Sequence, residues 1–249
     1  MKRSRKGIYK LADRLEEKLR ETDGGRILDV ATGKGVFLKE VTDLLKSFDH
    51  AVGIDQSEKH IAEARKEHES DKIKFKVMDA YNLDFDDNSF DMVTVANSLH
   101  HFNDPQKIVW EMYRVLKPGG LFLVYEMVHD SQTEEQLTHV YMHHWWAEID
   151  TATGIVHNPT FDRDELTALI GTLDFTKTEN IELDDLEADP KDKKTIDWLN
   201  DICDQYIGRA KEHPELAPLA DRGEQIKERL RGIGIHWATE YCILGRKTG

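Results

Sequence analysis

The chain has 249 residues, of which 39% are hydrophobic and 33% carry a charge, and its formal net charge is −14 at pH 7. This length suits one large α/β domain with insertions, and so acidic a chain argues against general affinity for nucleic-acid phosphates. No apolar run could span a bilayer, and no apolar signal segment follows the basic residues 1–6. We therefore expect a cytoplasmic protein that neither crosses a membrane nor binds nucleic acid.

Apolar runs and amphipathic stretches alternate through the first half of the chain. A helix over 8–21 is predicted by apolar residues at helical spacing, and two glycines at 24–25 end it. Further on, strands are expected at 26–31, 50–55, 73–78, 90–96 and 121–125, with helices after Gly35, at 57–69 and from Pro105 to Leu116. Strands and helices that alternate at this rhythm form a parallel sheet with right-handed crossovers.

The rhythm breaks after Glu126. The remaining elements are expected as a His- and Trp-rich helix within 129–160, a helix at 162–170, a strand at 175–183, helices over 190–231 and a strand at 238–244. The predicted fold class is α/β, with a doubly wound, mostly parallel seven-stranded sheet and helical insertions. We predict a single domain over 1–249 with a cofactor-binding core at 24–128. The insertions 129–160 and 190–231 would form a lid or an oligomer interface, such as that of a homodimer.

The stretch from Ile27 to Gly35 is an apolar strand that runs into a turn with one acid, Asp29, and two glycines, Gly33 and Gly35. Glycine lacks a Cβ, so the backbone here can approach a ligand closely or adopt positive φ. In open α/β sheets, ligands bind beyond the carboxyl ends of the strands. The turn therefore predicts a site for a nucleotide-like cofactor, although glycines can also serve only to make a tight turn.

Two further acids end neighbouring strands. Asp55 ends the second strand, where a carboxylate can accept hydrogen bonds from both ribose hydroxyls, and Asp79 ends the third, where it can accept from an adenine amino group. The alternatives are a charge at a helix start for Asp55 and a turn residue for Asp79. Because three successive turns agree, we favour the cofactor interpretation.

A nicotinamide dinucleotide is the rival ligand. Its fingerprint needs a third glycine where the helix packs closely against the strand, and this chain has Leu38 at that position. Asp29 lies just before the turn and would repel a pyrophosphate. These details favour S-adenosylmethionine over a dinucleotide.

The ordered motifs of residues 24–128 resemble those of the class I S-adenosylmethionine-dependent methyltransferases, in particular the group with the ubiquinone/menaquinone biosynthesis enzymes. Asp29–Gly35 is similar to the acidic, glycine-rich motif of the family, with Ala31 at its first glycine. The other motifs, in chain order, are Gly53-Ile54-Asp55, Asp79-Ala80, Phe90–Val93, Ala96–Phe102 and Arg114–Gly120. The resemblance also implies a final antiparallel strand, here 238–244, paired with 175–183.

The resemblance implies roles for individual residues. Asp29 would face the methionine amino group, Asp55 would hold the ribose, and Asp79 would bind the adenine edge. Asn97 would lie beneath the sulfonium. The full set of implied cofactor-binding residues is Asp29, Ala31, Gly33, Gly35, Asp55, Gln56, Asp79, Ala80 and Asn97.

Two candidates for catalysis follow the fourth and fifth strands. His100 comes just after the fourth strand and Glu126 ends the fifth, so both are expected at the rim of the active site. A general base helps only where the acceptor must lose a proton, and histidine titrates near neutral pH. The alternatives are packing or helix capping for His100 and a salt bridge for Glu126.

The segment 139–148 is rich in histidine and aromatic residues. We predict that it forms a lid over the acceptor, with core packing or an oligomer interface as alternatives. The residues expected to contact the acceptor are Tyr9, Tyr141, His144 and Trp145. His139 and His143 are spaced four apart, as metal ligands on a helix can be, but the sequence specifies no third ligand, so no metal is predicted.

The function predicted from these features is S-adenosylmethionine-dependent methyl transfer to a small-molecule acceptor, with S-adenosylhomocysteine as product. The alternatives are a non-catalytic S-adenosylmethionine-binding regulator, an RNA methyltransferase and a nicotinamide oxidoreductase. The RNA alternative is disfavoured because Ala96–Leu99 does not match the Asn-Pro-Pro-Tyr type of motif used on base amines.

Overall fold

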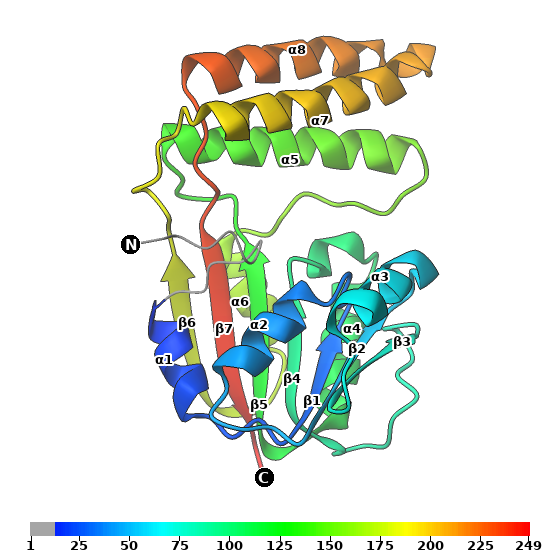
Figure 1. Ribbon diagram of the computed structural model, residues 1–249, viewed down its shortest axis with the longest axis vertical. Coiled ribbons are helices and arrows are strands. Elements are labelled where there is room, and N and C mark those ends of the chain that lie inside the picture. The colour runs from blue at the N-terminus through cyan, green and yellow to red at the C-terminus, as the bar shows by residue number, and fades with distance from the viewer. Residues whose placement is uncertain (1–12) are drawn as a thin grey trace.

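A computed structural model of the protein describes residues 13–249. The sheet has seven strands in the order β3-β2-β1-β4-β5-β7-β6 (Figure 1). Their bounds are β1 (Arg26–Val30), β2 (His50–Asp55), β3 (Ile73–Val77), β4 (Phe90–Ala96), β5 (Leu116–Met127), β6 (Phe175–Leu183) and β7 (Glu240–Lys247). Only β7 runs antiparallel to its neighbours, β5 and β6. The predicted α/β fold with a mostly parallel seven-stranded sheet is confirmed.

The helices cover both faces of the sheet and its carboxyl edge. Their bounds are α1 (Asp13–Glu21), α2 (Val36–Leu44), α3 (Glu58–His68), η1 (Leu99–His101), α4 (Pro105–Val115), α5 (Glu134–Ala152), α6 (Arg163–Ile170), α7 (Lys193–Lys211), η2 (Pro214–Leu216) and α8 (Ala217–Gly232). Residues of α1, α2 and α3 pack on one face, and those of α4 and α6 on the other. Helices α5, α7 and α8 lie together beyond the carboxyl ends of the strands (Figure 1).

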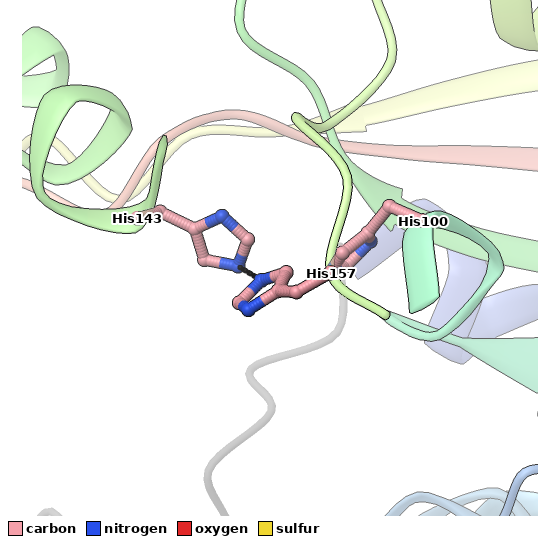
Figure 2. A group of neighbouring side chains, drawn as sticks. All are labelled: His100, His143 and His157. Atoms are coloured by element: carbon pink, nitrogen blue, oxygen red, sulfur yellow. Dashed lines mark hydrogen bonds between the residues drawn. The ribbon is translucent and has the colours of Figure 1, made fainter. Parts of the chain in front are cut away.

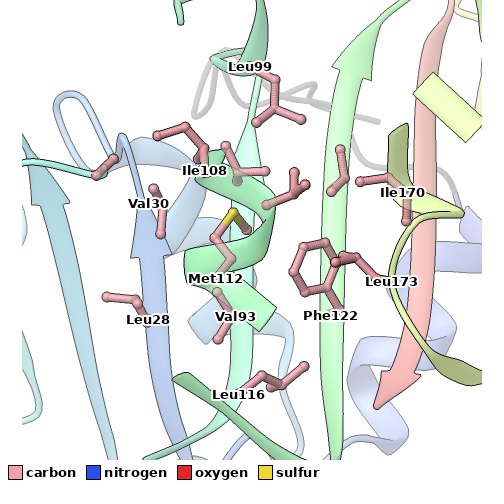
Figure 3. Close-up of a cluster of buried hydrophobic side chains, with 14 of the residues drawn as sticks. Leu28, Val30, Val93, Leu99, Ile108, Met112, Leu116, Phe122, Ile170 and Leu173 are labelled. Carbon is pink, nitrogen blue, oxygen red and sulfur yellow. The ribbon is translucent and has the colours of Figure 1, made fainter. Parts of the chain in front are cut away.

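The second face shows how the sequence pattern produces this packing. Ile108 and Met112 recur one helical turn apart on α4, and both side chains are fully buried against Val93 of β4 and Phe122 of β5 (Figure 3). The next helix on this face, α6, begins with a capping box in which Asp162 accepts the backbone N–H of Glu165 at 2.7 Å. Strand β1 lies between β2 and β4, so the chain reverses its winding there. Ligand sites in open α/β sheets form at such a reversal.

The two predicted insertions come together as one unit, which we call the helical layer and define as α5, α7 and α8. Its core includes Trp145 of α5, Leu199 of α7 and Leu230 of α8, none of which has measurable exposure. At Gly223 of α8, an added Cβ would lie 2.5 Å from the Trp145 ring and from Ile207. Glycine therefore lets α8 approach α5 and α7 closely. No helix within residues 13–249 is long and apolar enough to cross a membrane.

The element bounds differ from the predictions in the last strand, which is found at Glu240–Lys247 and not at 238–244, and in three further places. The described part of the first helix begins at Asp13, so the start of the predicted 8–21 helix and Tyr9 lie outside the described residues. Strand β5 begins at Leu116 because the turn after α4 already pairs with Phe90, with an irregular register before Met92. Helix α7 begins after Asp192, whose side chain accepts the N–H of Thr195 at 2.9 Å.

Replacing Trp145 with alanine should lower the free energy of unfolding by about 3–5 kcal/mol, because a large buried side chain is lost and a cavity remains. Urea titration followed by circular dichroism would measure the change. The matched control is Trp110→Ala, since Trp110 is 57% exposed; its effect should stay within about 0.5 kcal/mol. Equal effects of the two substitutions would contradict the packing described for the helical layer.

Candidate active site

The glycine-rich loop after β1 has the backbone conformation that the sequence suggests. Gly33 and Gly35 have positive φ, at 53° and 79°, and Ala31 has φ 54°. A Cβ at Gly35 would lie 2.6 Å from the Phe75 ring, whereas a Cβ at Gly33 would meet nothing within 4 Å. Gly35 is thus needed for packing, and Gly33 leaves space beside the loop. The left-handed conformation of Ala31 explains why this position suits the first glycine of the family motif.

Asp29 lies at the bottom of this loop. Its carboxyl group is 1% exposed, and its Oδ1 accepts a hydrogen bond from Thr94 Oγ1 at 2.6 Å. Its Oδ2 is buried, and no hydrogen-bond partner for it is found among residues 13–249. Burial raises the pKa of Asp29 to about 6, and the charge of Asp55 adds to the rise. A cavity of about 160 Å³ lies here, lined by Asp29, the glycine loop and Ser98. A positively charged ligand in this cavity would supply the missing partner.

The other predicted cofactor residues lie along the same edge of the sheet. Asp55 Oδ2 accepts the N–H of Gly33 at 2.9 Å and its Oδ1 accepts the N–H of Ser57 at 2.8 Å. Asp79 Oδ1 accepts the N–H of Tyr81 at 2.9 Å. Gln56 and Asp79 are exposed, Ala80 is buried, and none of Asp55, Gln56, Asp79 and Ala80 lines the cavity at Asp29. Both acids thus have local backbone partners, and their contacts with ribose and adenine stay predictions.

Asn97 connects three strands at the end of β4. It has φ 43°, a left-handed conformation that asparagine tolerates. Its Oδ1 accepts the N–H of Met127 at 2.7 Å, and its Nδ2 donates to Glu240 Oε1 at 3.2 Å. Asn97 therefore lies where β5 and β7 meet the loop after β4.

Glu240 is a site residue that sequence reasoning missed. Burial raises its pKa to about 8, and the nearby charge of Glu126 adds to the rise. No hydrogen-bond partner of its Oε2 is found in the part of the chain that the structure describes. A carboxyl group with a raised pKa keeps its proton more readily than an ordinary glutamate, and the protonated form can donate a hydrogen bond to a ligand. It begins a strand that is remote from the cofactor motifs, and no local pattern identifies it.

His100 and Glu126, predicted separately, are in direct contact. Glu126 is completely buried, and its Oε2 lies 3.0 Å from Nδ1 of His100, which is 2% exposed. Glu126 Oε1 accepts the backbone N–H groups of Ser98 and Leu99 at 2.7 and 2.8 Å. The carboxylate thus fixes the histidine ring with Nδ1 as donor. Nε2 is buried, has no partner among the described residues, and is available as an acceptor.

A larger cavity of about 520 Å³, which we call the acceptor cavity, lies at the ends of β4, β5 and β7. Its size suits a small molecule. It is lined by Asn97, His100, His101, Tyr125, Met127, His139, His143, Leu183, Asp185, Trp198, Trp237, Ala238 and Glu240. The wall is mainly aromatic and apolar, with a few polar groups.

The predicted lid residues lie elsewhere. Trp145 points into the core of the helical layer, where its Nε1 donates to the carbonyl of Leu219 at 2.8 Å. Tyr141 is 47% exposed and packs on Arg229, and His144 Nε2 lies 3.1 Å from Thr160 Oγ1. None of the three lines the acceptor cavity. Helix α5 does cover the cavity, but through His139 and His143, because the opposite face of the helix packs on α7 and α8.

A cluster of three histidines lies at the wall of the acceptor cavity. His100, His143 and His157 come from η1, α5 and the following loop, and one ring nitrogen of each lies within 4.8 Å of the others (Figure 2). His139 is separate, because its Nδ1 accepts the N–H of Ala238 at 2.9 Å. Burial, with smaller effects of the neighbouring histidines, lowers the pKa of His143 far below its usual value. The cluster thus includes His143 but not His139, and its third member, His157, lies in a loop.

Comparison with known proteins finds similarity in the first half of the chain. Residues 28–124 match a family model described as a methyltransferase domain. A demethylmenaquinone methyltransferase of Bacteroides fragilis is 40% identical over 106 residues, which cover 41% of this chain and 43% of that protein. The match thus spans less than half the length of this relative.

Two solved structures share the fold over 95% of the chain. One is a proposed methyltransferase of Bacillus halodurans C-125, with a TM-score of 0.62, 19% identity and 98% of its own chain covered. The other is a phosphoethanolamine N-methyltransferase of Haemonchus contortus in complex with phosphomonomethylethanolamine and S-adenosylhomocysteine, with a TM-score of 0.56, 16% identity and 53% covered.

These findings agree with the predicted resemblance to S-adenosylmethionine-dependent methyltransferases: residues 28–124 match a methyltransferase domain. The site geometry fits this cofactor. The unpartnered Asp29 Oδ2 suits its positively charged amino group, and the open space beside Gly33 suits an extended ligand lying along the loop.

Affinity for S-adenosylmethionine should fall below pH 6, because Asp29, whose pKa is about 6, must be ionised to pair with a cationic ligand. The dissociation constant should rise by up to tenfold for each pH unit, as linkage to one proton requires (about 1.4 kcal/mol per unit). Isothermal titration calorimetry between pH 5 and 7.5 would measure it. Asp29→Asn should bind more weakly and lose this dependence; an unchanged pH profile in that variant would contradict the assignment.

Glu240→Gln should stabilise the protein increasingly as pH rises. Glu240 ionises near pH 4.5 in the unfolded chain and near 8 in the native state. Between these values only the unfolded state releases the proton, so the native protein loses stability as pH rises. The variant should melt several degrees higher at pH 8, since ~1 kcal/mol shifts Tm by about 2–4 °C at this size, and at an unchanged temperature at pH 4.5. A difference independent of pH would contradict this reading.

Proposed function

We propose that this protein transfers the methyl group of S-adenosylmethionine to a nucleophilic atom of a small acceptor held in the acceptor cavity. One observation carries the proposal: the end of β4 and the loop that follows it line both cavities. Ala96 and Ser98 line the cavity at Asp29, while Asn97 and His100 line the acceptor cavity. A cofactor and an acceptor bound in these cavities would therefore meet across this short segment.

The walls of the acceptor cavity support an acceptor with an aromatic or apolar body. Trp198, Trp237 and Met127 provide large apolar surfaces, whereas Glu240 and Asn97 provide a few polar contacts. The relatives named above act on chemically different molecules. The family model matches residues 28–124, and most residues that line the acceptor cavity lie beyond this segment. The choice of acceptor thus depends on parts of the chain outside the matched domain.

Methyl transfer requires little from the protein beyond alignment of the cofactor with the acceptor. Bound S-adenosylmethionine supplies an electrophilic methyl carbon on a sulfonium. The aromatic walls exclude water and orient the acceptor, which can contribute ~7–11 kcal/mol to lowering the barrier. His100 faces the acceptor, because its ring is fixed by Glu126 and its Nε2 has no hydrogen-bond partner within residues 13–249.

We also propose a reducing compartment, such as the cytoplasm, and a small molecule in place of nucleic acid. Both cysteines, Cys203 and Cys242, are free and buried, as is usual where thiols stay reduced. The net charge of −14 supports the absence of a nucleic-acid partner.

The test begins with the cofactor and proceeds to turnover. Calorimetry should show S-adenosylmethionine binding at a single site. Formation of S-adenosylhomocysteine should then be measured with a panel comprising a phenol, a quinol, an aryl thiol and an aryl amine. Binding without turnover by any member would favour the regulator alternative, and no heat at millimolar ligand would exclude the function.

His100→Asn keeps a donor to Glu126 and removes Nε2. It should lower kcat/KM by about a hundredfold or more, since loss of correct positioning alone can cost this much, with affinity for S-adenosylmethionine within twofold of the parent. His213→Asn, at an exposed position remote from both cavities, is the matched control. Full activity of His100→Asn would remove His100 from the mechanism.

A further inference from the structure

We propose that His100, His143 and His157, the histidine cluster of Figure 2, bind one divalent transition-metal ion, with zinc as the best match. The ion would present an open coordination position to the acceptor cavity. Binding of the ion does not depend on the proposed function. The action of the ion on the acceptor rests on that function, and the ion would link His100 to the acceptor.

The spacing of the ring nitrogens suits a tetrahedral ion. His143 Nε2 and His157 Nε2 lie 3.4 Å apart. Two nitrogens that each lie 2.0–2.1 Å from a tetrahedral zinc ion are about 3.3–3.4 Å from one another. The ligand atoms of all three histidines lie within 4.8 Å of one another, so a modest side-chain movement completes the site.

Two carboxylates orient the cluster from behind. Glu126 lies 3.0 Å from His100 Nδ1, and Asp150 lies 2.8 Å from His157 Nδ1. Histidines that bind metals usually donate their second ring N–H to a carboxylate, which fixes the tautomer and leaves the other nitrogen free to coordinate. The cluster repeats this arrangement at two of its three members, on segments far apart in the chain.

Asp150 is itself held in place. Its Oδ1 accepts from Arg209 Nη1 at 2.8 Å, and the hydroxyl of Tyr206 donates to its Oδ2 at 3.3 Å. Both partners belong to α7, so the helical layer fixes the orientation of His157. Glu126 is held in turn by the backbone N–H groups at the start of η1.

The cluster has unmet coordination capacity. Within the described residues, His100 Nε2, the nitrogen that would bind the ion, is buried without a hydrogen-bond partner. His100 itself is 2% exposed, and the ring of His101 packs beside it with centroids 4.3 Å apart. Glu126 and Asp150 are negatively charged when ionised, and because Arg209 already pairs with Asp150, the two carboxylates would offset part of the charge of a divalent ion. A hydrogen bond between His143 and His157 alone would leave His100 Nε2 unsatisfied.

The open position defines a chemical class of acceptor. Three protein ligands with a fourth position open are typical of catalytic rather than structural zinc, and His100 and His143 both line the acceptor cavity. An acceptor thiol or hydroxyl that coordinates there would lose its proton to water, because a divalent ion lowers the pKa of such a group. Its sulfur or oxygen lone pair would then bond to the methyl carbon as the carbon–sulfonium bond breaks, and S-adenosylhomocysteine would leave as a neutral thioether.

The test uses the full chain, stripped of metal with a chelator, and Co²⁺ as a spectroscopic probe of the zinc site. No cofactor or acceptor is added, so the result does not depend on the proposed function. We expect one equivalent of Co²⁺ to give intense tetrahedral ligand-field bands that one equivalent of Zn²⁺ removes. Absence of stoichiometric binding at micromolar Co²⁺ and Zn²⁺ would overturn the proposal.

Variants assign the ligands. His143→Asn and His157→Asn should each weaken Co²⁺ binding by about a hundredfold or more; the second keeps an amide donor for Asp150. Asp150→Asn should weaken it by about 10–100-fold, as for other outer-shell partners. The matched control is His139→Asn, on the same helix and in the same cavity wall, which should bind Co²⁺ like the parent. Melting curves confirm that each variant folds, and unaltered binding in both ligand variants would overturn the site.

Turnover then separates the two proposals. If Co²⁺ binds but no acceptor of the panel yields S-adenosylhomocysteine, the proposed function fails while the metal site stands. If a thiol or phenol is methylated, activity should disappear in the metal-free protein and return with one equivalent of Zn²⁺. Equal rates with and without metal would overturn the action of the ion on the acceptor.

Discussion

The buried carboxylate of Glu126 is the group around which the acceptor side is organised. One oxygen accepts the N–H groups of Ser98 and Leu99, shortly after the end of β4, and the other fixes the ring of His100. This works because β4 and β5 are parallel neighbours, so Glu126 at the end of β5 lies beside the residues that follow β4. Without this carboxylate, two backbone donors and an imidazole would be buried without a partner, which costs more than the bonds contribute when formed.

The sheet and the cofactor loop could be predicted from the sequence because their signals are local. Alternating apolar runs and amphipathic helices specify a parallel sheet, and the carboxyl ends of such strands share one edge. Asp29 lies near the end of β1, and Gly33 and Gly35 follow in the next turn. The sequence therefore predicts both the motif and its place in the fold. His100 and Glu126 were both expected at this edge, although their contact depends on the register between β4 and β5.

The acceptor side could not be predicted in the same way, because its residues come from segments far apart in the chain. The pattern of α5 is apolar on more than one side, so the sequence does not show that Trp145 faces the helical layer while His139 and His143 face the cavity. His157 lies in an irregular loop, and Glu240 begins a strand. Their proximity to His100 is a property of tertiary structure, and no spacing rule along one element reports it.

The connection between β6 and β7 has a consequence for the acceptor cavity. These strands are antiparallel neighbours, and Leu183 pairs with Glu240, so the chain leaves and re-enters the sheet at adjacent positions. The intervening residues, with α7 and α8, can be exchanged or remodelled without altering the strand register, since insertions in such connections cost little. Leu183 and Glu240, the residues at the two ends of this connection, both line the acceptor cavity. An exchange of this connection would therefore change the wall of the acceptor cavity and leave the residues that line the cavity at Asp29 in place.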